Sequence, residues 1–455
     1  MNGKLDLETL KRLVEAGEID TVVVAMTDMQ GRLLGKRVAA RFFLDSVVEE
    51  TQGCDYLLTV DMEMEPVPGY EAASWALGYG DFVFKPDMNT LRRIPWLEGT
   101  ALVLCDVLDH HTHEDLPHSP RAILRKQLKR LADKGWKAYM ASELEFYVID
   151  EPYDAAREKD YKGLKHAGWY IEDYHVFQTT KEEPLIRAIR NGMENCGIPV
   201  EVSKGEWGPG QEEINLRYAE ALEMADRHVI YKNGAKEIAH LQGKAITFMA
   251  KLAYDLAGSS CHLHSSLWDA AKEKPLFADK AAEHGMSKLF RHYLAGQLAC
   301  APAMTYFFAP TINSYKRFQA GSFAPTKSAW SMDNRTAGFR ILGPGAGTRV
   351  ECRIPGADCN PYLAFAVTLA AGLHGIEQEL DPGPAYEGNL YEGEDVPDVP
   401  KTLRAALRAL DESEVMREAL GDQVVEHYLH AGRWEQQEYD RRVTDWEVIR
   451  NFERA

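Results

Sequence analysis

Two carboxylates stand inside an otherwise apolar strand pattern, and they constrain this chain more than any other feature. Residues 137–150 have the pattern of a strand, and its segment 143–149 (ELEFYVI) combines two glutamates with aliphatic and aromatic residues. Because residues i and i+2 of a strand share one face, Glu143 and Glu145 point the same way. Two like charges side by side among buried residues are costly unless a cation lies between them. The pattern favours a cation site, and a solvated strand face is the alternative.

Three further segments carry acidic or histidine side chains in patterns that suit the same site. Segment 204–216 (KGEWGPGQEEINL) places Glu206 and Glu213 on either side of a Gly-Pro-Gly bend, which glycine and proline favour. In segment 258–266 (GSSCHLHSS) the rings of His262 and His264 share one strand face,. Segment 349–355 (RVECRIP) places Glu351 between two arginines on one face. Each segment has an ordinary alternative: an acidic turn, polar lining and a salt-bridged strand face, respectively.

Arginines occur in two other segments, 313–318 (NSYKRF) and 333–340 (DNRTAGFR). Arginine is the planar, permanently charged donor that suits carboxylate and phosphate oxygens. Together with the glutamates, these arginines indicate either a surface network or the two halves of an ATP-dependent site. Carboxylates with one histidine and no thiolate suit Mg²⁺ or Mn²⁺, and carboxylate-held Mg²⁺ most often serves phosphoryl transfer. The residues therefore indicate a metal-dependent, phosphate-handling enzyme with an anionic substrate.

The composition narrows the class of protein further. The chain has 455 residues, with 52 Lys and Arg against 70 Asp and Glu, for a formal net charge of −18. This balance argues against sequence-independent binding of nucleic acid. No apolar run in the sequence approaches the ~20 residues of a membrane span, and the first residues lack the pattern of a signal peptide. The 7 cysteines include no CxxC pair, so they indicate neither a disulfide framework nor a zinc site. We expect a reduced cytoplasmic enzyme.

Hydrophobic periodicity predicts the order of the elements. The length fits two or three domains. The first hundred residues have an α+β pattern, with a helix over 5–16, a hairpin of 21–26 with 33–39, and strands at 82–84 and 100–105. A second region begins near residue 117, with a helix capped by Ser119, the strand 137–150, a helix over 218–241, an extended segment over 247–251 and an apolar helix over 363–376. We expect a surface loop over 377–400 and an amphipathic helical region over 401–455.

Taken in order, the segments ELEF, GEWGPGQEE, GSSCHLHSS, NSYKRF, DNRTAGFR and VECRIPGADCNPYLA resemble the glutamine synthetase superfamily over residues 117–455. Residues 28–32 and 80–87 match more loosely. The resemblance implies an α+β fold, with an N-terminal β-grasp domain over residues 1–113 and a catalytic domain over residues 117–455. The catalytic domain would contain a curved antiparallel sheet that forms a funnel with helices. The resemblance also implies a homo-oligomer, a dodecamer of two hexameric rings, with active sites between neighbouring subunits.

The resemblance assigns a role to each candidate site residue. It implies two divalent metals, Mg²⁺ or Mn²⁺, the first held by Glu145, Glu206 and Glu213. The second would bridge ATP phosphates and be held by Glu143, His262 and Glu351. The other positions match those that contact the nucleotide (His264, Ser266), L-glutamate (Gly258, Arg317, Arg353) and the phosphates of ATP (Arg335, Arg340). In such enzymes the γ-carboxylate of glutamate attacks the γ-phosphate of ATP, and an amine then displaces phosphate. Arg317, Arg335 and Asp61 match positions with catalytic roles.

The acceptor side departs from the enzymes that use ammonium. Phe323 stands where those enzymes carry the glutamate of a closing flap, and residues 60–65 (VDMEME) replace their Asp-Gly-Ser-Ser loop. Only Asp61 keeps its place there. A phenylalanine in place of a glutamate favours an acceptor with an organic tail, so the chain resembles the γ-glutamylamide-forming subgroup. We expect ethanolamine or a similar small monoamine as the acceptor, with Asp61, Glu63 and Phe323 near the amine.

Several alternatives stay open at this point. A polyamine acceptor would place its second cation near Glu63 or Glu65, and an ammonia-dependent glutamine synthetase is the nearest rival. An ATP–guanidino phosphotransferase shares the catalytic fold but not the two-metal ligand set. A catalytically silent scaffold would have lost metal ligands that this sequence retains. Tyr391 aligns with a tyrosine that some bacterial members adenylylate, and an ordinary loop tyrosine is the alternative there.

Overall fold

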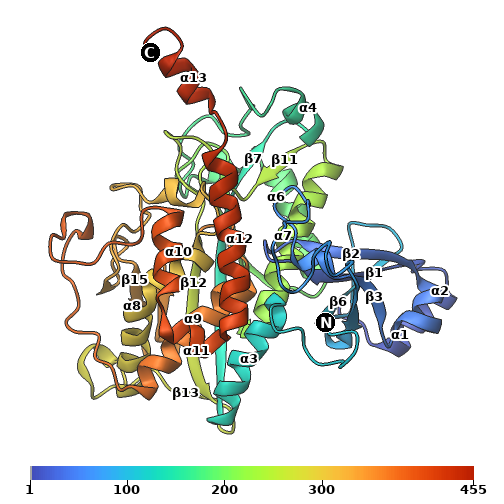
Figure 1. Cartoon of the computed structure of the whole chain (residues 1–455), viewed down its shortest axis with the longest axis horizontal. Helices are drawn as coiled ribbons and strands as arrows, with labels where there is room; N and C mark the ends of the chain where they lie inside the picture. Colours follow the sequence, from blue (N-terminus) through green and yellow to red (C-terminus); the bar gives the residue numbers. More distant parts are fainter. Residues whose placement is uncertain (1–2) are drawn as a thin grey trace.

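The structure is a computed structural model that describes residues 3–455, and its main strands form two sheets. The first sheet has the order β2-β1-β6-β4-β3, with β5 paired to β6. Its strands are β1 (Thr21–Thr27), β2 (Leu33–Ala39), β3 (Thr51–Cys54), β4 (Asp81–Pro86), β5 (Arg92–Arg93) and β6 (Thr100–Leu108). The helices and helical turns of this part are α1 (Leu7–Glu15), α2 (Ala40–Phe42), η1 (Phe43–Val47), η2 (Asp55–Leu58) and η3 (Met88–Thr90). Figure 1 shows this part in blue, beside the rest of the chain.

The first sheet agrees with the predicted α+β pattern. Strands β1 and β2 form the expected antiparallel hairpin, in which Thr27 pairs with Leu33. The carboxylate of Asp28 accepts the backbone N–H of Arg32 at 2.7 Å and its Nε–H at 2.7 Å, which closes the turn. Strand β6 lies on the other side of β1 and runs parallel to it.

The second sheet carries the predicted strand with two glutamates near its centre. Its order is β14-β15-β16-β12-β7-β9-β8, with β10 and β11 paired to β7 and β13 paired to β12. Its strands are β7 (Trp136–Ile149), β8 (Val200–Gly205), β9 (Gln211–Leu216), β10 (Ala219–Glu220), β11 (Ala245–Thr247), β12 (Cys261–Asp269), β13 (Lys274–Pro275), β14 (Trp330–Met332), β15 (Phe339–Leu342) and β16 (Arg349–Cys352). The pairs are antiparallel, as expected, except that β14 runs parallel to β15.

Helices flank the second sheet and form the C-terminal part of the chain (Figure 1). They are α3 (Pro120–Asp133), α4 (Tyr153–Glu158), α5 (Val176–Thr179), α6 (Glu183–Asn195), α7 (Ala221–Leu241), α8 (Lys288–Phe308), α9 (Pro361–Glu377), α10 (Leu403–Asp411), α11 (Glu414–Leu420), α12 (Asp422–Asp440) and α13 (Asp445–Asn451). Short 3₁₀ turns are η4 (Glu283–Gly285), η5 (Ser314–Arg317), η6 (Gly345–Gly347) and η7 (Leu390–Glu392). None of the helices between residues 3 and 455 has both the length and the apolar character needed to cross a membrane.

Several predicted boundaries differ from the observed ones. The helix predicted from residue 218 begins at Ala221, because Ala219 and Glu220 first pair with β7 as a short strand. The segment predicted to be extended over 247–251 contributes only Thr247 to a strand. Ser119 occupies the N-cap of α3 as predicted, but its side chain makes no capping hydrogen bond there.

A buried ionic network joins the two sheets. The guanidinium of Arg121, on α3, pairs with Asp87 and Asp106 from the first sheet region and with Asp226 on α7. The hydroxyl of Tyr362, on α9, donates to Asp226 at 2.5 Å. The side chain of Arg121 is only 5% exposed. These contacts fix the first sheet against the helices that support the second.

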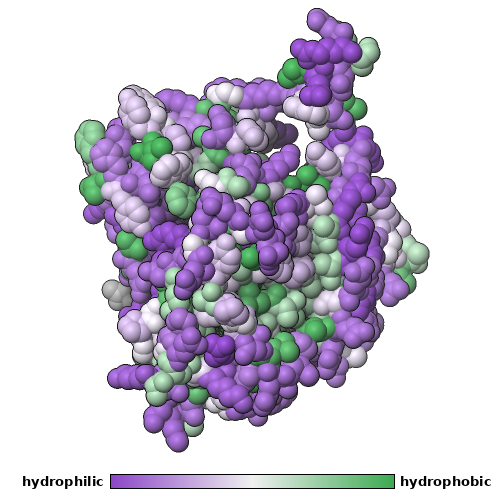
Figure 2. Space-filling model, turned by 90° about the vertical axis from the view of Figure 1, so that its left-hand side faces the viewer, coloured by the Kyte–Doolittle hydropathy of each residue, from purple (hydrophilic) through white to green (hydrophobic). Residues whose placement is uncertain are grey.

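The C-terminal helix α13 projects away from the body of the molecule (Figure 1). Apolar side chains on this helix and at its C-cap are exposed: 65% for Trp446, 77% for Ile449 and 85% for the C-cap residue Phe452. Figure 2 shows the projecting segment with apolar residues among hydrophilic ones. An exposed apolar group of this kind marks an interaction surface.

Candidate active site

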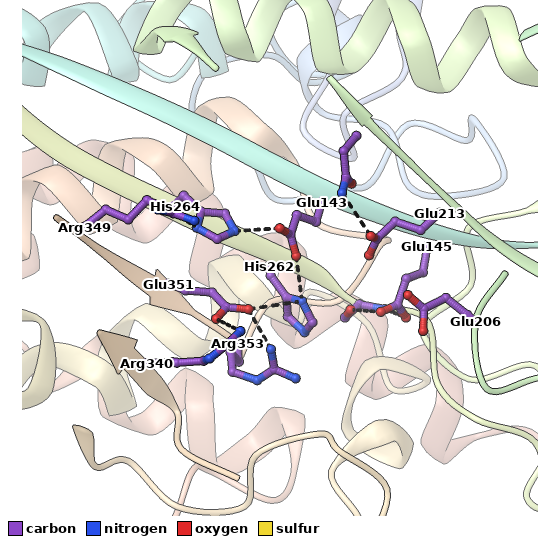
Figure 3. A network of polar contacts seen from close by, with 12 residues as sticks. Glu143, Glu145, Glu206, Glu213, His262, His264, Arg340, Arg349, Glu351 and Arg353 are labelled. Carbon is purple, nitrogen blue, oxygen red and sulfur yellow. Dashed lines mark hydrogen bonds and ion pairs between the residues drawn. The ribbon is translucent and has the colours of Figure 1, made fainter. Parts of the chain in front are cut away.

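A cavity of about 360 Å³ opens over one face of the second sheet, and most of the predicted site residues line it. Strand alternation places Glu143 and Glu145 of β7 on this face, as predicted. Glu145 lies directly opposite Glu213 on β9, and Glu143 lies directly opposite His262 on β12. Figure 3 shows the two glutamates of β7 between the side chains from these neighbouring strands. The pairing of β7 with β9 and β12 therefore brings these predicted residues together.

The first acidic group consists of Glu145, Glu206 and Glu213. One carboxylate oxygen of each lies within 4.8 Å of those of the other two. Glu145 is held in place by Ser260, whose backbone N–H donates at 2.8 Å and whose hydroxyl donates at 2.5 Å. Lys204 pairs with Glu206 and lies 3.9 Å from Glu213. This lysine has no role in the prediction, although it stands in the same segment as the two glutamates.

Burial leaves this first group with excess negative charge. Burial raises the pKa of Glu206 to about 7, and the neighbouring charge of Glu145 adds to the effect, while Lys204 opposes it. Burial, followed by the charges of Glu143 and Glu206, raises the pKa of Glu213 well above its ordinary value. Three clustered carboxylates, of which Glu206 and Glu213 have raised pKa values, provide the oxygen donors that a hard divalent cation requires,. The residues present therefore fit a divalent metal.

The second group surrounds Glu143 and Glu351 and includes both histidines. The Nε2 atom of His264 lies 2.9 Å from Glu143, and the Nδ1 atom of His262 lies 3.3 Å from Glu143 and 3.5 Å from Glu351. The compact set within 4.8 Å consists of Glu143, His264 and Glu351. Geometry thus brings His264 as close to the acidic residues as His262, although the resemblance gives the two histidines different roles. Arg349 donates to Nδ1 of His264 at 3.0 Å.

Arginines balance the charge of this second group. Glu351 accepts from Arg353 at 2.6 Å and from Arg340 at 3.0 Å. Burial alone would raise the pKa of Glu351, but Arg353, His262 and His264 hold it at about 2. The pKa of Glu351 is therefore lowered, whereas those of Glu206 and Glu213 are raised.

The predicted glutamate-binding residues lie at the end of the same cavity. The guanidinium of Arg317 donates to the backbone carbonyls of Ile354 at 2.7 Å and Arg353 at 2.8 Å. A Cβ atom at Gly258 would lie 2.6 Å from the Cγ of Arg317, so the close packing here needs glycine. Arg335 also lines the cavity. The four predicted arginines thus line one cavity: Arg317, Arg335, Arg340 and Arg353.

A second cavity, of about 320 Å³, meets the first at Glu143 and Asn215. It contains His264 and Ser266, the two predicted nucleotide-contacting residues. Three aromatic residues line it as well: Tyr139, Tyr218 and Trp268. The rings of Tyr139 and Trp268 lie 5.5 Å apart, and those of Tyr139 and Tyr218 lie 6.0 Å apart. Sequence reasoning missed these aromatic side chains, although strand alternation places Tyr139 on the same face of β7 as Glu143 and Trp268 on the same face of β12 as His264,.

The rim of the first cavity is aromatic. Phe323 lines the cavity as predicted, and Trp207 lies beside it. Tyr174 lines the same rim, and the ammonium of Lys204 lies 4.9 Å from the centroid of its ring. The hydroxyl of Tyr391 donates to the carbonyl of Ala324 at 3.0 Å, next to Phe323. The loop tyrosine singled out in the sequence is therefore tied to the flap segment.

Two predicted site residues do not join the others within this chain. Asp61 lines a separate cavity with Trp434 and Glu435. Its carboxylate accepts from the backbone N–H groups of Glu63 and Glu65, each at 3.0 Å. In one chain, Asp61 and Glu63 thus stabilise their own turn and do not meet Phe323.

Comparisons with known proteins give consistent results. Residues 117–451 match the family described as "Glutamine synthetase, catalytic domain". The chain is 51% identical over 451 residues to the gamma-glutamylethanolamide synthetase GlnA4 of Streptomyces coelicolor, covering 99% of this chain and 96% of that protein. It is 37% identical to the glutamate–isopropylamine ligase of a Pseudomonas species, covering 98% of each. A solved structure titled "Apo GmaS without ligand" superposes with a TM-score of 0.85 at 29% identity, covering 98% of this chain and 99% of that one.

Proposed function

This chain belongs to the glutamine synthetase family, and from that premise we propose that it is an ATP-dependent ligase that joins the γ-carboxylate of L-glutamate to a small amine, ethanolamine or a similar monoamine. The observation that carries the proposal is the pairing of an acidic, arginine-rich cavity with an aromatic rim at Phe323. The 51% identity to a gamma-glutamylethanolamide synthetase over 99% of the chain supports it.

In the first step, the γ-carboxylate of glutamate attacks the γ-phosphate of ATP, an O–P bond forms and ADP leaves. Arg317 and Arg353 hold the glutamate, while Arg335 and Arg340 stabilise the charge that spreads over the transferring group. The aromatic cavity beside His264 and Ser266 takes the nucleotide. Because the two cavities meet at Glu143, the γ-phosphate and the γ-carboxylate are brought together there, which removes much of the entropic cost of their encounter,.

The residues that would hold divalent metals are Glu145, Glu206 and Glu213 for the first ion and Glu143, His262 and Glu351 for the second, with His264 within reach of the second. Bound there, Mg²⁺ or Mn²⁺ supplies positive charge to the phosphate oxygens. The charge balance differs between the groups, since two arginines compensate Glu351 whereas the single cation Lys204 only partly compensates the first group.

In the second step, the neutral amine nitrogen attacks the carbonyl carbon of γ-glutamyl phosphate, the acyl C–O bond breaks and phosphate leaves. One proton of the amine must pass to a base. The rings of Phe323 and Trp207 give the acceptor's organic tail an apolar surface at the rim of the cavity. A carboxylate at the same place would instead suit a bare ammonium ion.

Asp61 and Glu63 fit this scheme in an assembly of subunits. They lie away from the cavity of their own chain, so we propose that they serve the site of a neighbouring subunit, with Asp61 as the base. The exposed apolar face of α13 supports association with a further copy, and we propose a dodecamer of two hexameric rings.

We also propose the division into a β-grasp domain over residues 1–113 and a catalytic domain over residues 117–455, supported by the end of the first sheet at Leu108.

An amine panel tests the proposed function. Purified protein is supplied with ATP, Mg²⁺ or Mn²⁺, L-glutamate and one amine at a time, and phosphate release and product mass are measured. Ethanolamine or a small alkylamine is expected to support release with the mass of a γ-glutamylamide. Turnover with ammonium alone would instead establish a glutamine synthetase. Turnover only with putrescine or a longer polyamine would move the substrate to that class, and no release with any acceptor would overturn the ligase.

A further inference from the structure

A third group of carboxylates lies outside the two cavities, formed by Glu172, Glu182 and Glu212. One oxygen of each lies within 4.8 Å of those of the other two, so this group is as compact as Glu145, Glu206 and Glu213. The three residues are 0%, 2% and 1% exposed, respectively. Glu182 is the N-cap of α6, Glu212 stands on β9 and Glu172 lies in the segment between α4 and α5.

Within the described residues 3–455, four oxygens of this group have no hydrogen-bond partner: Oε2 of Glu172, both carboxylate oxygens of Glu182 and Oε1 of Glu212. Glu172 accepts one hydrogen bond, from the backbone N–H of Gly210 at 3.0 Å. The neighbouring lysines are engaged elsewhere, because Lys181 donates to Gln178 and Lys244 pairs with Asp150. By contrast, Lys204 partly compensates the first acidic group of the active site.

Three buried carboxylates without compensation cannot all stay ionised. Retained protons or a bound cation can neutralise such a group. The packing around Glu172 is tight, since a Cβ atom at Gly168 would lie 1.5 Å from its Oε1 atom.

We propose that Glu172, Glu182 and Glu212 bind a third divalent cation, distinct from the two of the active site. The group combines buried oxygens that lack a partner among residues 3–455 with close mutual approach of the three carboxylates. Carboxylate oxygens without nitrogen or sulfur donors select hard cations such as Mg²⁺, Mn²⁺ or Ca²⁺.

The position of this group gives the cation a structural role. Gln211 and Glu213 line the active-site cavity, so Glu212 between them points to the opposite face of β9,. Glu172 directly precedes Asp173 and Tyr174, which line the same cavity. A cation bound by these three residues links the segment that carries Tyr174 to the face of β9 opposite the active-site cavity. It thereby stabilises the rim where the amine enters.

Metal counting tests the third site. Mn²⁺ bound per subunit is measured by elemental analysis after equilibrium dialysis of the purified protein, for the native chain and for Glu182→Gln, which keeps the side-chain volume but removes the charge. Three ions per subunit are expected in the native protein and two in the variant. Two ions in both proteins, with higher thermal stability in the variant, would mean that protons neutralise the group, and would overturn the proposal.

A second variant keeps the test decisive if Glu182→Gln does not fold. The double variant Glu145→Gln/Glu351→Gln removes one ligand from each active-site group but leaves the third group intact. It is expected to retain one tight Mn²⁺ per subunit, and saturating Mg²⁺, Mn²⁺ or Ca²⁺ is expected to raise its melting temperature by about 2–4 °C. No bound ion and no rise in melting temperature with any of the three cations would overturn the third site while leaving the ligase proposal untouched.

Discussion

The rings of Phe323 and Trp207 meet edge to face at the rim of the cavity, with centroids 5.7 Å apart and planes inclined by 60°. Each side chain is 48% exposed. The contact joins the flap segment to the loop that carries Glu206, one of the proposed metal ligands. An acceptor that enters here meets ring surface, and this gives the predicted preference for an organic amine a physical basis.

Replacement of Phe323 by glutamate should move the enzyme towards ammonium. The change removes apolar contact with the acceptor's tail and adds a charge beside it, and a difference of this kind is worth about 10–200-fold in discrimination. We predict that Phe323→Glu lowers kcat/KM for ethanolamine by at least about tenfold and raises the ratio of ammonium to ethanolamine turnover. Phosphate release with both acceptors measures the effect. Phe323→Tyr, which keeps the ring, serves as the control, and an unchanged ratio in Phe323→Glu would contradict the role of the rim.

Trp268 should hold the base of the nucleotide. Its ring stands 5.5 Å from that of Tyr139 in the second cavity, and a base stacked on an aromatic side chain gains about 1–3 kcal/mol,. We predict that Trp268→Ala raises the KM for ATP by about 5–150-fold, with little change in the KM for glutamate. Steady-state kinetics with each substrate varied in turn measures the two constants. Trp268→Phe should restore most of the affinity, and equal changes in both KM values would point to a general loss of structure.

Much of the fold was predictable because it rests on local patterns. The alternation in β7 predicted which glutamates share a face, and the turn at Asp28 predicted the hairpin of β1 and β2. The start of α7 was predicted three residues early, because the pairing of Ala219 with Met140 depends on a strand about 80 residues away. Helical periodicity is a local pattern and cannot indicate pairing with a distant strand.

The chemistry of the site was predictable only where side chains follow one strand or one motif. The predicted ligands of both acidic groups came together, because strand order places β9 and β12 on either side of β7. The hydrogen bond from Arg349 to His264 and the ring pairs around Trp268 join different strands, so no single segment reveals them. The buried group of Glu172, Glu182 and Glu212 brings together residues from a loop, a helix start and a strand, and no sequence spacing indicates it.

Arg121 should contribute far more stability than its neighbour Arg125. Arg121 is 5% exposed and compensates Asp87, Asp106 and Asp226, whereas Arg125 is 39% exposed and pairs with Asp106 and Asp115. Loss of one partner from a buried ionic network costs about 3–5 kcal/mol, and loss of an exposed pair about 0.2–1 kcal/mol. We predict that Arg121→Met lowers the urea midpoint of unfolding strongly, and that the matched variant Arg125→Met hardly changes it. Equal effects of both substitutions would show that the network does not join the two sheets energetically.

The first metal group should bind Mn²⁺ more tightly as the pH rises. Burial and the charge of Glu145 raise the pKa of Glu206 to about 7 in the metal-free fold, against an ordinary value of 4.5. The metal-free fold therefore holds an extra proton between about pH 4.5 and pH 7, so its stability falls as the pH rises through that window. A metal must displace that proton. Affinity should therefore rise with pH, by about tenfold per pH unit for each proton that the metal displaces.

Calorimetric titration with Mn²⁺ at pH 6, 7 and 8, in two buffers of different ionisation enthalpy, measures both the affinity and the number of protons released. We expect more protons to be released at pH 6 than at pH 8, in line with the raised pKa values of Glu206 and Glu213,. Glu206→Gln should bind Mn²⁺ more weakly and release fewer protons at pH 6, while the exposed control Glu49→Gln should behave like the native protein. Because Glu206 would then be the group that exchanges a proton for the metal, an affinity that stays constant from pH 6 to pH 8 would exclude it as a ligand of the first ion.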